Sequence, residues 1–225
     1  WPSAATIGSL IIKPMRAVIF DMDGVLVDSE PVYMNRFLHF MQLHQISIDE
    51  QAYRQTVGWT SKRTWEWALS YWPKTMTLTE LQTCYRAYWK DKPVRYDEVL
   101  DQDVLPVLNQ LRAKGIKTAV ASSSPRAAID QMLKQCGLAS CFDTIVSGEQ
   151  FVKSKPDPEI YRFTALQLDC RCADCVAVED STVGIAAAYA AGMTVCAKQD
   201  FRFGFDQSRA HRSIRSLTEI LDWME

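Results

Sequence analysis

Three aspartates, Asp21, Asp23 and Asp28, lie within eight positions directly after an apolar run of the chain. Carboxylates crowded in this way repel one another, and the fold gains nothing from them unless a positive group lies among them. Carboxylate oxygens are the ligands of Mg²⁺, a cation that shares its coordination between protein and substrate phosphate. The spacing therefore predicts chemistry with a metal and an anion.

Other polar side chains stand at the ends of later apolar runs. Ser122 and Ser123 close the second run, Lys155 follows the third, and Glu179 and Asp180 close the fourth. In an open α/β sheet the carboxyl ends of the strands form one ligand-binding edge. Hydroxyls and backbone N–H groups there can cradle phosphate, a lysine can neutralise charge, and a free aspartate can attack phosphorus. We therefore expect these segments to converge on one phosphate-handling site.

The elements that must position these residues follow from the apolar pattern. The runs do not alternate, which is typical of parallel strands buried on both faces. They cover residues 17–20, 116–122, 142–147, 175–179 and 193–197. Helical patterns separate the later runs, so the sequence predicts an α/β fold with a doubly wound parallel sheet.

The stretch between the first two strands is too long for one crossover. It is largely helical in pattern and rich in Trp and Tyr, which we interpret as helix-packing residues. We therefore predict an all-helical cap domain over residues 32–95, inserted into an α/β core formed by residues 14–31 and 96–225.

Composition excludes several classes of protein. The chain has 225 residues, is 48% hydrophobic and carries a formal net charge of −2. No basic stripe suggests nucleic acid as a partner, and no apolar run approaches the roughly 20 residues that span a bilayer. The segment 1–14 has an apolar patch without a preceding positive residue, which is typical of an extension rather than a signal peptide.

The seven cysteines are odd in number and scattered, which disfavours a disulfide framework and favours a reducing, cytoplasmic location. Cys170, Cys172 and Cys175 form one cluster. A structural zinc site would need a fourth ligand, and the neighbouring sequence offers none. We interpret the three as incidental thiols, with zinc or a regulatory disulfide as the alternative.

Four motifs, DMDGVLVDS, ASSS, KPDP and VEDSTVG, occur in this order with a cap after the first. Together they resemble the haloacid dehalogenase superfamily, and within it the branch that contains β-phosphoglucomutase and small sugar-phosphate phosphatases. The resemblance covers nearly the whole chain from about Pro14. It implies a Mg²⁺-dependent enzyme that acts on a small phosphorylated metabolite, with a monomer as the family default.

The resemblance also assigns roles at the first and fourth motifs. Asp21 corresponds to the nucleophile and a Mg²⁺ ligand. Asp23 corresponds to the general acid and base, with its backbone carbonyl on the metal. Asp180 corresponds to the other metal ligand, supported by Glu179, and Gly24 lets the chain turn sharply beside the metal.

The second and third motifs handle the phosphoryl group. By resemblance, Ser122 and the N–H of Ser123 hold the phosphoryl oxygens, and Lys155 bridges the phosphoryl group and the nucleophile. Lys153 is then a surface lysine, and Ser124 is interpreted as a helix N-cap.

A calcium loop that starts at Asp21 is excluded, because its sixth and twelfth positions are Leu26 and Val32 instead of glycine and glutamate. We expect Asp28 and Ser29 to cap or hinge the first cap helix.

Two readings of the activity stay open, a phosphatase and a mutase. The mutase relatives carry a histidine twelve residues after the nucleophile, where this chain has Tyr33, and Lys-Asn where it has Pro125 and Arg126. These differences favour a phosphatase, although Arg126 can still bind an anion. A dehalogenase would need no aspartate at position 23, and an inactive binding protein would lack a catalytic residue, whereas none is missing.

The substrate-specificity loop of relatives corresponds to residues 58–63. Lys62 or Arg63 could contact the distal polar groups of the substrate there, and a solvated helix start is the equally open alternative.

Overall fold

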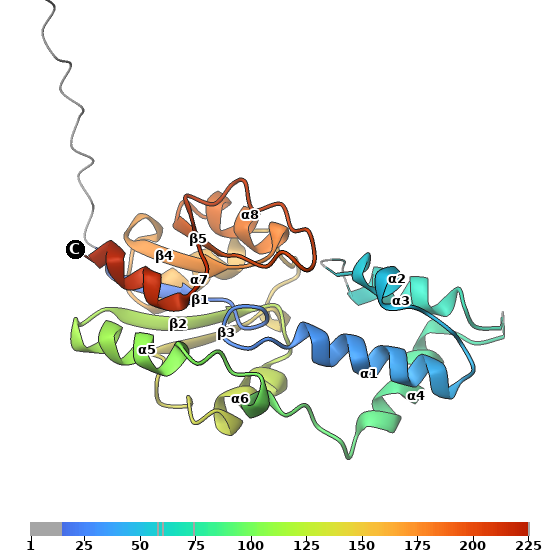
Figure 1. Ribbon diagram of the computed structural model, residues 1–225. Coiled ribbons are helices and arrows are strands. Elements are labelled where there is room, and N and C mark those ends of the chain that lie inside the picture. Colours follow the sequence, from blue (N-terminus) through green and yellow to red (C-terminus); the bar gives the residue numbers. More distant parts are fainter. Residues whose placement is uncertain (1–14, 58, 60, 74, 225) are drawn as a thin grey trace, which may run out of the picture.

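The computed structural model describes residues 15–57, 59, 61–73 and 75–224, and a six-stranded parallel sheet lies at its centre. The strand order is β3-β2-β1-β4-β5-β6 (Figure 1). The strands are β1 (Ala17–Phe20), β2 (Lys117–Ser122), β3 (Thr144–Ser147), β4 (Cys175–Glu179), β5 (Thr194–Lys198) and β6 (Arg212–Ile214). The predicted doubly wound α/β class is confirmed, with one strand more than the five expected.

The central strand β1 shows why its sequence is apolar without alternation. All four of its residues are buried, because helices cover both faces of the sheet. Val18 and Phe20 belong to the core on one face, and Ala17 and Ile19 belong to the core on the other.

Each face of the sheet is covered by its own helices. On the Val18 face lie α5 (Val104–Ala113), α6 (Arg126–Gln135) and a 3₁₀ segment, Leu217–Met224. On the opposite face lie α7 (Glu159–Gln167) and α8 (Thr182–Ala190), as Figure 1 shows. Both faces are therefore closed, and ligands can reach the sheet only at its edges.

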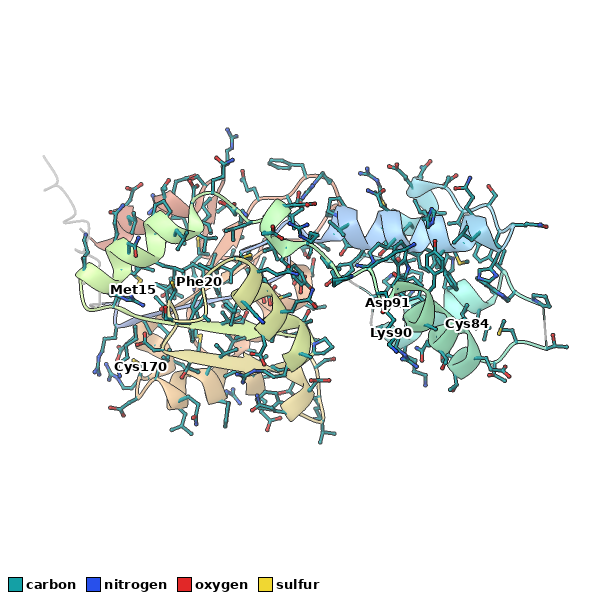
Figure 2. All side chains as sticks on the ribbon, turned by 90° about the horizontal axis from the view of Figure 1, so that it is seen from below. Met15, Phe20, Cys84, Lys90, Asp91 and Cys170 are labelled. Atoms are coloured by element: carbon teal, nitrogen blue, oxygen red, sulfur yellow. The ribbon has the colours of Figure 1, made fainter. Side chains whose placement is uncertain are left out.

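A helical lobe follows β1 and extends away from the sheet (Figures 1 and 2). It consists of α1 (Glu30–Leu43), α2 (Glu50–Arg54), α3 (Ser61–Leu69) and α4 (Leu78–Trp89). Aromatic rings fill its own core: Tyr85 lies edge-on to Phe40 and Trp65, with ring centroids 5.2 and 4.9 Å away. Six Trp and Tyr residues of the insertion thus pack its helices together, as predicted: Tyr53, Trp65, Trp67, Trp72, Tyr85 and Tyr88.

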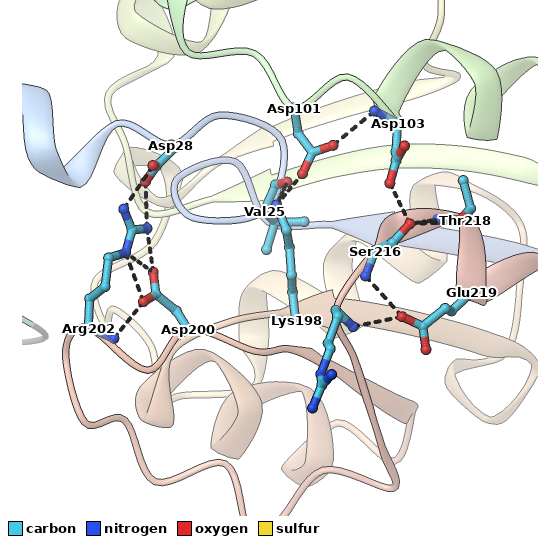
Figure 3. A network of polar contacts seen from close by, with 11 residues as sticks. Val25, Asp28, Asp101, Asp103, Lys198, Asp200, Arg202, Ser216, Thr218 and Glu219 are labelled. Atoms are coloured by element: carbon cyan, nitrogen blue, oxygen red, sulfur yellow. Dashed lines mark hydrogen bonds and ion pairs between the residues drawn. The ribbon is translucent and has the colours of Figure 1, made fainter.

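The two segments that connect the lobe to the sheet lie side by side. The N–H of Asp28 donates to the carbonyl of Val99 at 2.8 Å. Lys198 at the end of β5 donates to the carbonyl of Val25 at 2.9 Å and to Asp101 at 2.5 Å (Figure 3). These bonds hold both connections against the edge of the sheet where β1 ends.

No helix of the described part of the chain is long and apolar enough to cross a membrane. All seven cysteines are thiols in this structure. Cys170, Cys172 and Cys175 are not part of the cluster of potential metal-ligand atoms found among the described residues.

Candidate active site

The register of the sheet brings Asp21 to the same edge as the end of β4. Phe20 is paired with Val178, and the N–H of Asp21 then donates to the carbonyl of Val178 at 2.9 Å. Glu179 is the next residue of β4, and Ser122 is the last residue of β2 on the other side of β1. Parallel strands thus place these polar residues together at their carboxyl ends.

Lys155 connects the ends of three strands. Its ammonium group donates to Asp21 at 2.7 Å, to Glu179 at 2.6 Å and to the carbonyl of Ala121 at 3.0 Å. Burial alone would lower the pKa of Lys155, but the two carboxylates raise it well above its usual value. Burial raises the pKa of Asp21 to about 7, and Lys155 opposes this shift. A permanent cation therefore lies beside the first aspartate.

Glu179 is fully buried and accepts hydrogen bonds from several donors. Besides Lys155, its Oε1 accepts the hydroxyl of Tyr161 at 2.5 Å, and its Oε2 accepts the hydroxyl of Ser181 at 3.2 Å. Gly184 leaves room for this carboxylate, because a Cβ on it would lie 2.0 Å from Oε1. Glu179 is thus held in place by these donors and in turn positions the ammonium group of Lys155.

Asp23 is held by two hydroxyls. Ser29 donates to its Oδ1 at 2.5 Å and Ser124 donates to its Oδ2 at 2.7 Å. Burial raises the pKa of Asp23, and the two hydroxyls counteract the shift. An aspartate with a raised pKa and a fixed orientation, close to another carboxyl group, is suited to give and take a proton.

These bonds correct two expectations about capping. Ser29 stands at the N-cap position of α1 but makes no side-chain capping bond there, and Pro125 rather than Ser124 precedes α6. Both serine hydroxyls bind Asp23 because its carboxylate is the stronger acceptor nearby. Asp28 lies at the crossing to the helical lobe, and its carboxylate is bound by Arg202.

The residues expected at the metal fit a divalent cation. Asp21, Glu179 and Asp180 each place a carboxylate oxygen within 4.8 Å of the others. Glu179 already accepts hydrogen bonds at both oxygens, which leaves Asp21 and Asp180 to hold a cation directly. Burial raises the pKa of Asp180 well above its usual value, and the neighbouring carboxylates add to the shift. Oxygen donors whose charges oppose one another are the donor set that Mg²⁺ satisfies.

Gly24 shows how tightly this site is built. Its φ is +80°, a conformation that favours glycine, and a Cβ there would lie 2.1 Å from Oδ2 of Asp180. The chain can therefore turn beside the carboxylate only because residue 24 has no side chain.

Ser122 and Ser123 lie beside these carboxyl groups. The hydroxyl of Ser122 is buried and accepts the N–H of Ser124 at 3.0 Å. Both serines line the same cavity as Asp21, Asp23 and Lys155. This is the arrangement expected of a cradle for phosphoryl oxygens.

The cavity has a volume of about 610 Å³ and lies between the sheet edge and the helical lobe. Its inner end carries the residues described above. Its outer wall includes Trp59 and Lys62 from the lobe and Phe203 and Phe205 from the segment after β5. A small ester with its phosphoryl group at Asp21 would therefore place its other end against the outer wall.

The expected specificity residues are not all found in this wall. Lys62 lines the cavity and its side chain reaches Glu66 at 3.8 Å. The guanidinium of Arg63 lies 3.8 Å from the ring centroid of Trp59. Arg126 is not among the lining residues that the structure describes, and it pairs with Asp130 at 2.9 Å. Gly58 and Thr60 lie outside the described residues.

Four supporting residues were not identified as such from the sequence: Ser29, Ser124, Tyr161 and Arg202. Their types gave no distinctive signal, since a serine before a helix indicates a cap and a tyrosine inside a helix indicates core packing. Their roles depend on partners far along the chain, such as Asp23 for Ser124.

Comparisons with known proteins agree with this geometry. Residues 18–198 match the haloacid dehalogenase-like hydrolase family. The chain is 31% identical to a phosphorylated carbohydrates phosphatase of Thermotoga maritima over 80% of this chain and 82% of that protein. It is also 31% identical to the β-phosphoglucomutase of Bacillus subtilis, over 80% of this chain and 81% of the relative.

A solved structure shares the fold. CbbY from Rhodobacter sphaeroides superposes with a TM-score of 0.77 at 22% identity, over 94% of this chain and 99% of that one. The helical segment inserted after β1 in a parallel α/β sheet is thus common to both. From its motifs, its fold and its relatives, this chain belongs to the haloacid dehalogenase-like hydrolase family, near the β-phosphoglucomutases and the sugar-phosphate phosphatases.

Proposed function

We propose that this protein is a Mg²⁺-dependent phosphatase that hydrolyses a small phosphorylated metabolite, a sugar or polyol phosphate, through an aspartyl-phosphate on Asp21. The observation that carries the proposal is the pair of aspartates in one cavity. Asp21 is bound by Lys155, and Asp23 is held by two hydroxyls with a raised pKa. These contacts support Asp21 as the nucleophile and Asp23 as the acid–base group of the proposed reaction.

In the first half of the reaction, a carboxylate oxygen of Asp21 attacks the phosphorus of the monoester. The bond between phosphorus and the leaving oxygen breaks, and Asp23 gives its proton to that oxygen. Lys155 and the serines of the cradle bind the equatorial oxygens, where negative charge gathers.

In the second half, Asp23 takes a proton from a water molecule. The water oxygen attacks phosphorus and the bond to Asp21 breaks, which releases inorganic phosphate and restores both aspartates. The same carboxyl group serves as acid and then as base, which suits an aspartate whose pKa is raised by burial.

Asp21, Asp180 and the backbone carbonyl of Asp23 would hold Mg²⁺. The cation would supply Lewis-acid stabilisation of the phosphoryl oxygens and screen the nucleophile from the substrate's charge. Gly24 and Glu179 support this arrangement, the first by close approach and the second by orienting Lys155.

The substrate class rests on the relatives and the cavity. A phosphatase of phosphorylated carbohydrates is among the similar proteins, and a cavity of about 610 Å³ suits a small ester.

A phosphoglucomutase is the second candidate, because a β-phosphoglucomutase is equally similar in sequence. A mutase must hold a bisphosphate by both ends and keep water out. The hydroxyl of Tyr33 meets that of Tyr96 at 2.8 Å, and Arg126 is paired with Asp130 outside the described cavity lining. Tyr33 and Arg126 stand where the mutase relatives carry other residues, and both are bonded to other residues of this chain. Neither is therefore arranged to hold a second phosphate, which favours water as the acceptor of the phosphoryl group.

A phosphate-release assay over sugar and polyol monophosphates tests the proposal. Inorganic phosphate should appear in step with substrate loss, require Mg²⁺, and vanish in Asp21→Asn. Conversion of β-glucose 1-phosphate into glucose 6-phosphate with almost no phosphate release would instead establish the mutase.

A further inference from the structure

The outer wall of the active-site cavity carries more acidic than basic groups. Of the described residues that line the cavity beyond the phosphoryl site, Asp28, Glu30 and Asp200 are acidic, and Lys62 is basic. The side chain of Lys62 is 78% exposed and lies 3.8 Å from Glu66, so its charge is largely screened. The leaving group of a substrate would meet this wall.

Two of the three acidic groups are already bound by an arginine (Figure 3). Arg202 binds Asp28 through two bonds of 2.7 and 2.9 Å and Asp200 through bonds of 2.6 to 3.1 Å. A guanidinium between two carboxylates uses its fork of donors on them. The donors of Arg202 therefore bind carboxylates of the wall, and the two carboxylates outweigh its single positive charge.

Glu30 is placed differently. It is the first residue of α1, next to Ser29, which binds Asp23, so it lies close to the group that protonates the leaving oxygen. The side chain of Tyr53 on α2, which is buried, lies close to this carboxyl group. Burial raises the pKa of Glu30 to about 7, and the charge of Asp23 acts in the same direction. None of the ion pairs found in the described part of the chain includes Glu30.

We propose that Glu30 is the specificity-determining residue of this phosphatase: its carboxyl group binds a hydroxyl near the ester bond, and with Asp28 and Asp200 it selects neutral polyhydroxylated leaving groups over anionic ones. This inference rests on the proposed phosphatase function and adds which small phosphorylated metabolites the cavity accepts.

The chemistry of the wall supports both parts of the proposal. The carboxyl group of Glu30 lines the cavity and is partly buried at the start of α1, so it loses less conformational freedom than an exposed one when it accepts a bond from a substrate hydroxyl. A leaving group with its own carboxylate or second phosphate would bring another negative charge beside three acidic groups, whose charges Arg202 and the exposed Lys62 offset only in part. Phe203 and Phe205, with ring centroids 5.9 Å apart, offer apolar faces to the C–H groups of a polyol.

The test compares kcat/KM for sorbitol 6-phosphate and for 2-phosphoglycolate, whose leaving groups differ in charge. We measure the ratio of the two constants in the wild-type protein, in Glu30→Gln, in Glu30→Ala and in a matched control, Glu50→Gln. Glu50 is an exposed residue of α2 in the same lobe and is not among the described lining residues. Glutamine keeps the shape of Glu30 and removes its charge.

The wild type should prefer sorbitol 6-phosphate, and each Glu30 variant should lower the ratio by about tenfold, the size expected when a charged hydrogen-bond partner is lost. Glu50→Gln should leave the ratio unchanged. An unchanged ratio in the Glu30 variants, an equal fall in Glu50→Gln, or an equal loss on both substrates and on p-nitrophenyl phosphate would overturn the proposal. Phosphate release that persists in Asp21→Asn would instead refute the phosphatase mechanism, so the two failures are distinguishable.

Discussion

The hydroxyl of Ser124 donates a hydrogen bond of 2.7 Å to Oδ2 of Asp23, across 101 positions of the sequence. The bond joins the segment after β2 to the segment after β1. Together with Ser29 on the other oxygen, it fixes the rotation of the carboxyl group that, in the proposed mechanism, reaches both the leaving oxygen and the attacking water.

Removal of this hydroxyl should slow the reaction without weakening substrate binding. We expect Ser124→Ala to lower kcat by about tenfold, because hydrogen bonds to charged groups are strong and acid–base catalysis depends on orientation. KM should change little, and Ser70→Ala, on an exposed serine of the helical lobe, should behave as the wild type. Steady-state kinetics would check this; a rise in KM at constant kcat would contradict a role through Asp23.

Tyr161 should matter through Glu179 and Lys155. Tyr161→Phe removes one hydroxyl from a buried carboxylate, and we expect a loss of about 1–2 kcal/mol of unfolding free energy with a several-fold fall in kcat. Tyr189→Phe is the control, because Tyr189 is half exposed on α8. Urea unfolding and kinetics would measure both effects; wild-type kcat in Tyr161→Phe would show that the hydroxyl does not help to position Lys155.

The direction of the stability change in Gly184→Ala tests how tightly this residue packs against Glu179. A glycine to alanine change within a helix ordinarily stabilises by about 1 kcal/mol. Here the added Cβ would lie 2.0 Å from Glu179, so we expect Gly184→Ala to destabilise the fold by about 2–4 kcal/mol and to impair turnover. A thermal melt that shifts upward would mean that the carboxylate has room to move.

The stabilisation by Mg²⁺ should increase with pH. Burial raises the pKa of Asp21 to about 7, from a usual value near 4, and also raises that of Asp180. Without metal, these groups favour the fold at low pH, and their contribution is lost as the pH rises from about 4 through about 7. Because the cation binds the ionised carboxylates, it restores stability above that range.

Thermal melts in chelator and in Mg²⁺ at pH 6 and pH 8 would measure this difference. The Mg²⁺-induced rise in Tm should be larger at pH 8, and it should shrink in Asp180→Asn, because this change removes a proposed carboxylate ligand of the cation. An equal rise at both pH values in the wild type would contradict a cation held by Asp21 and Asp180.

Much of the fold could be predicted because buried parallel strands have a strong pattern. Four short apolar runs predicted strands β1 to β4. The polar residues at or just after their ends, namely Asp21, Ser122, Lys155 and Glu179, predicted the polar edge of the sheet. The strand β6 was missed because only Ile214 of its three residues is buried, so its sequence shows no apolar run.

The position of Asp21 was predictable because it directly follows the apolar strand β1. The contacts that support the site around it were not predictable. Arg202 binds Asp28 across 174 positions, and its own segment has no regular structure. A local pattern cannot report such a pairing, because the two residues meet only when the loop after β5 folds over the end of β1. The residues of the outer wall of the cavity, on which the proposal for Glu30 rests, could therefore be identified only from the structure.

The formation of a phosphoryl bond on Asp21 is the central claim, and rapid acid quench followed by peptide mass spectrometry tests it most directly. Wild-type protein mixed with Mg²⁺ and sorbitol 6-phosphate should carry one phosphoryl group on the peptide that contains Asp21, and Asp21→Asn should carry none. Release of inorganic phosphate by wild-type protein with the Asp21 peptide unmodified, or a phosphoryl group on another residue, would contradict the mechanism.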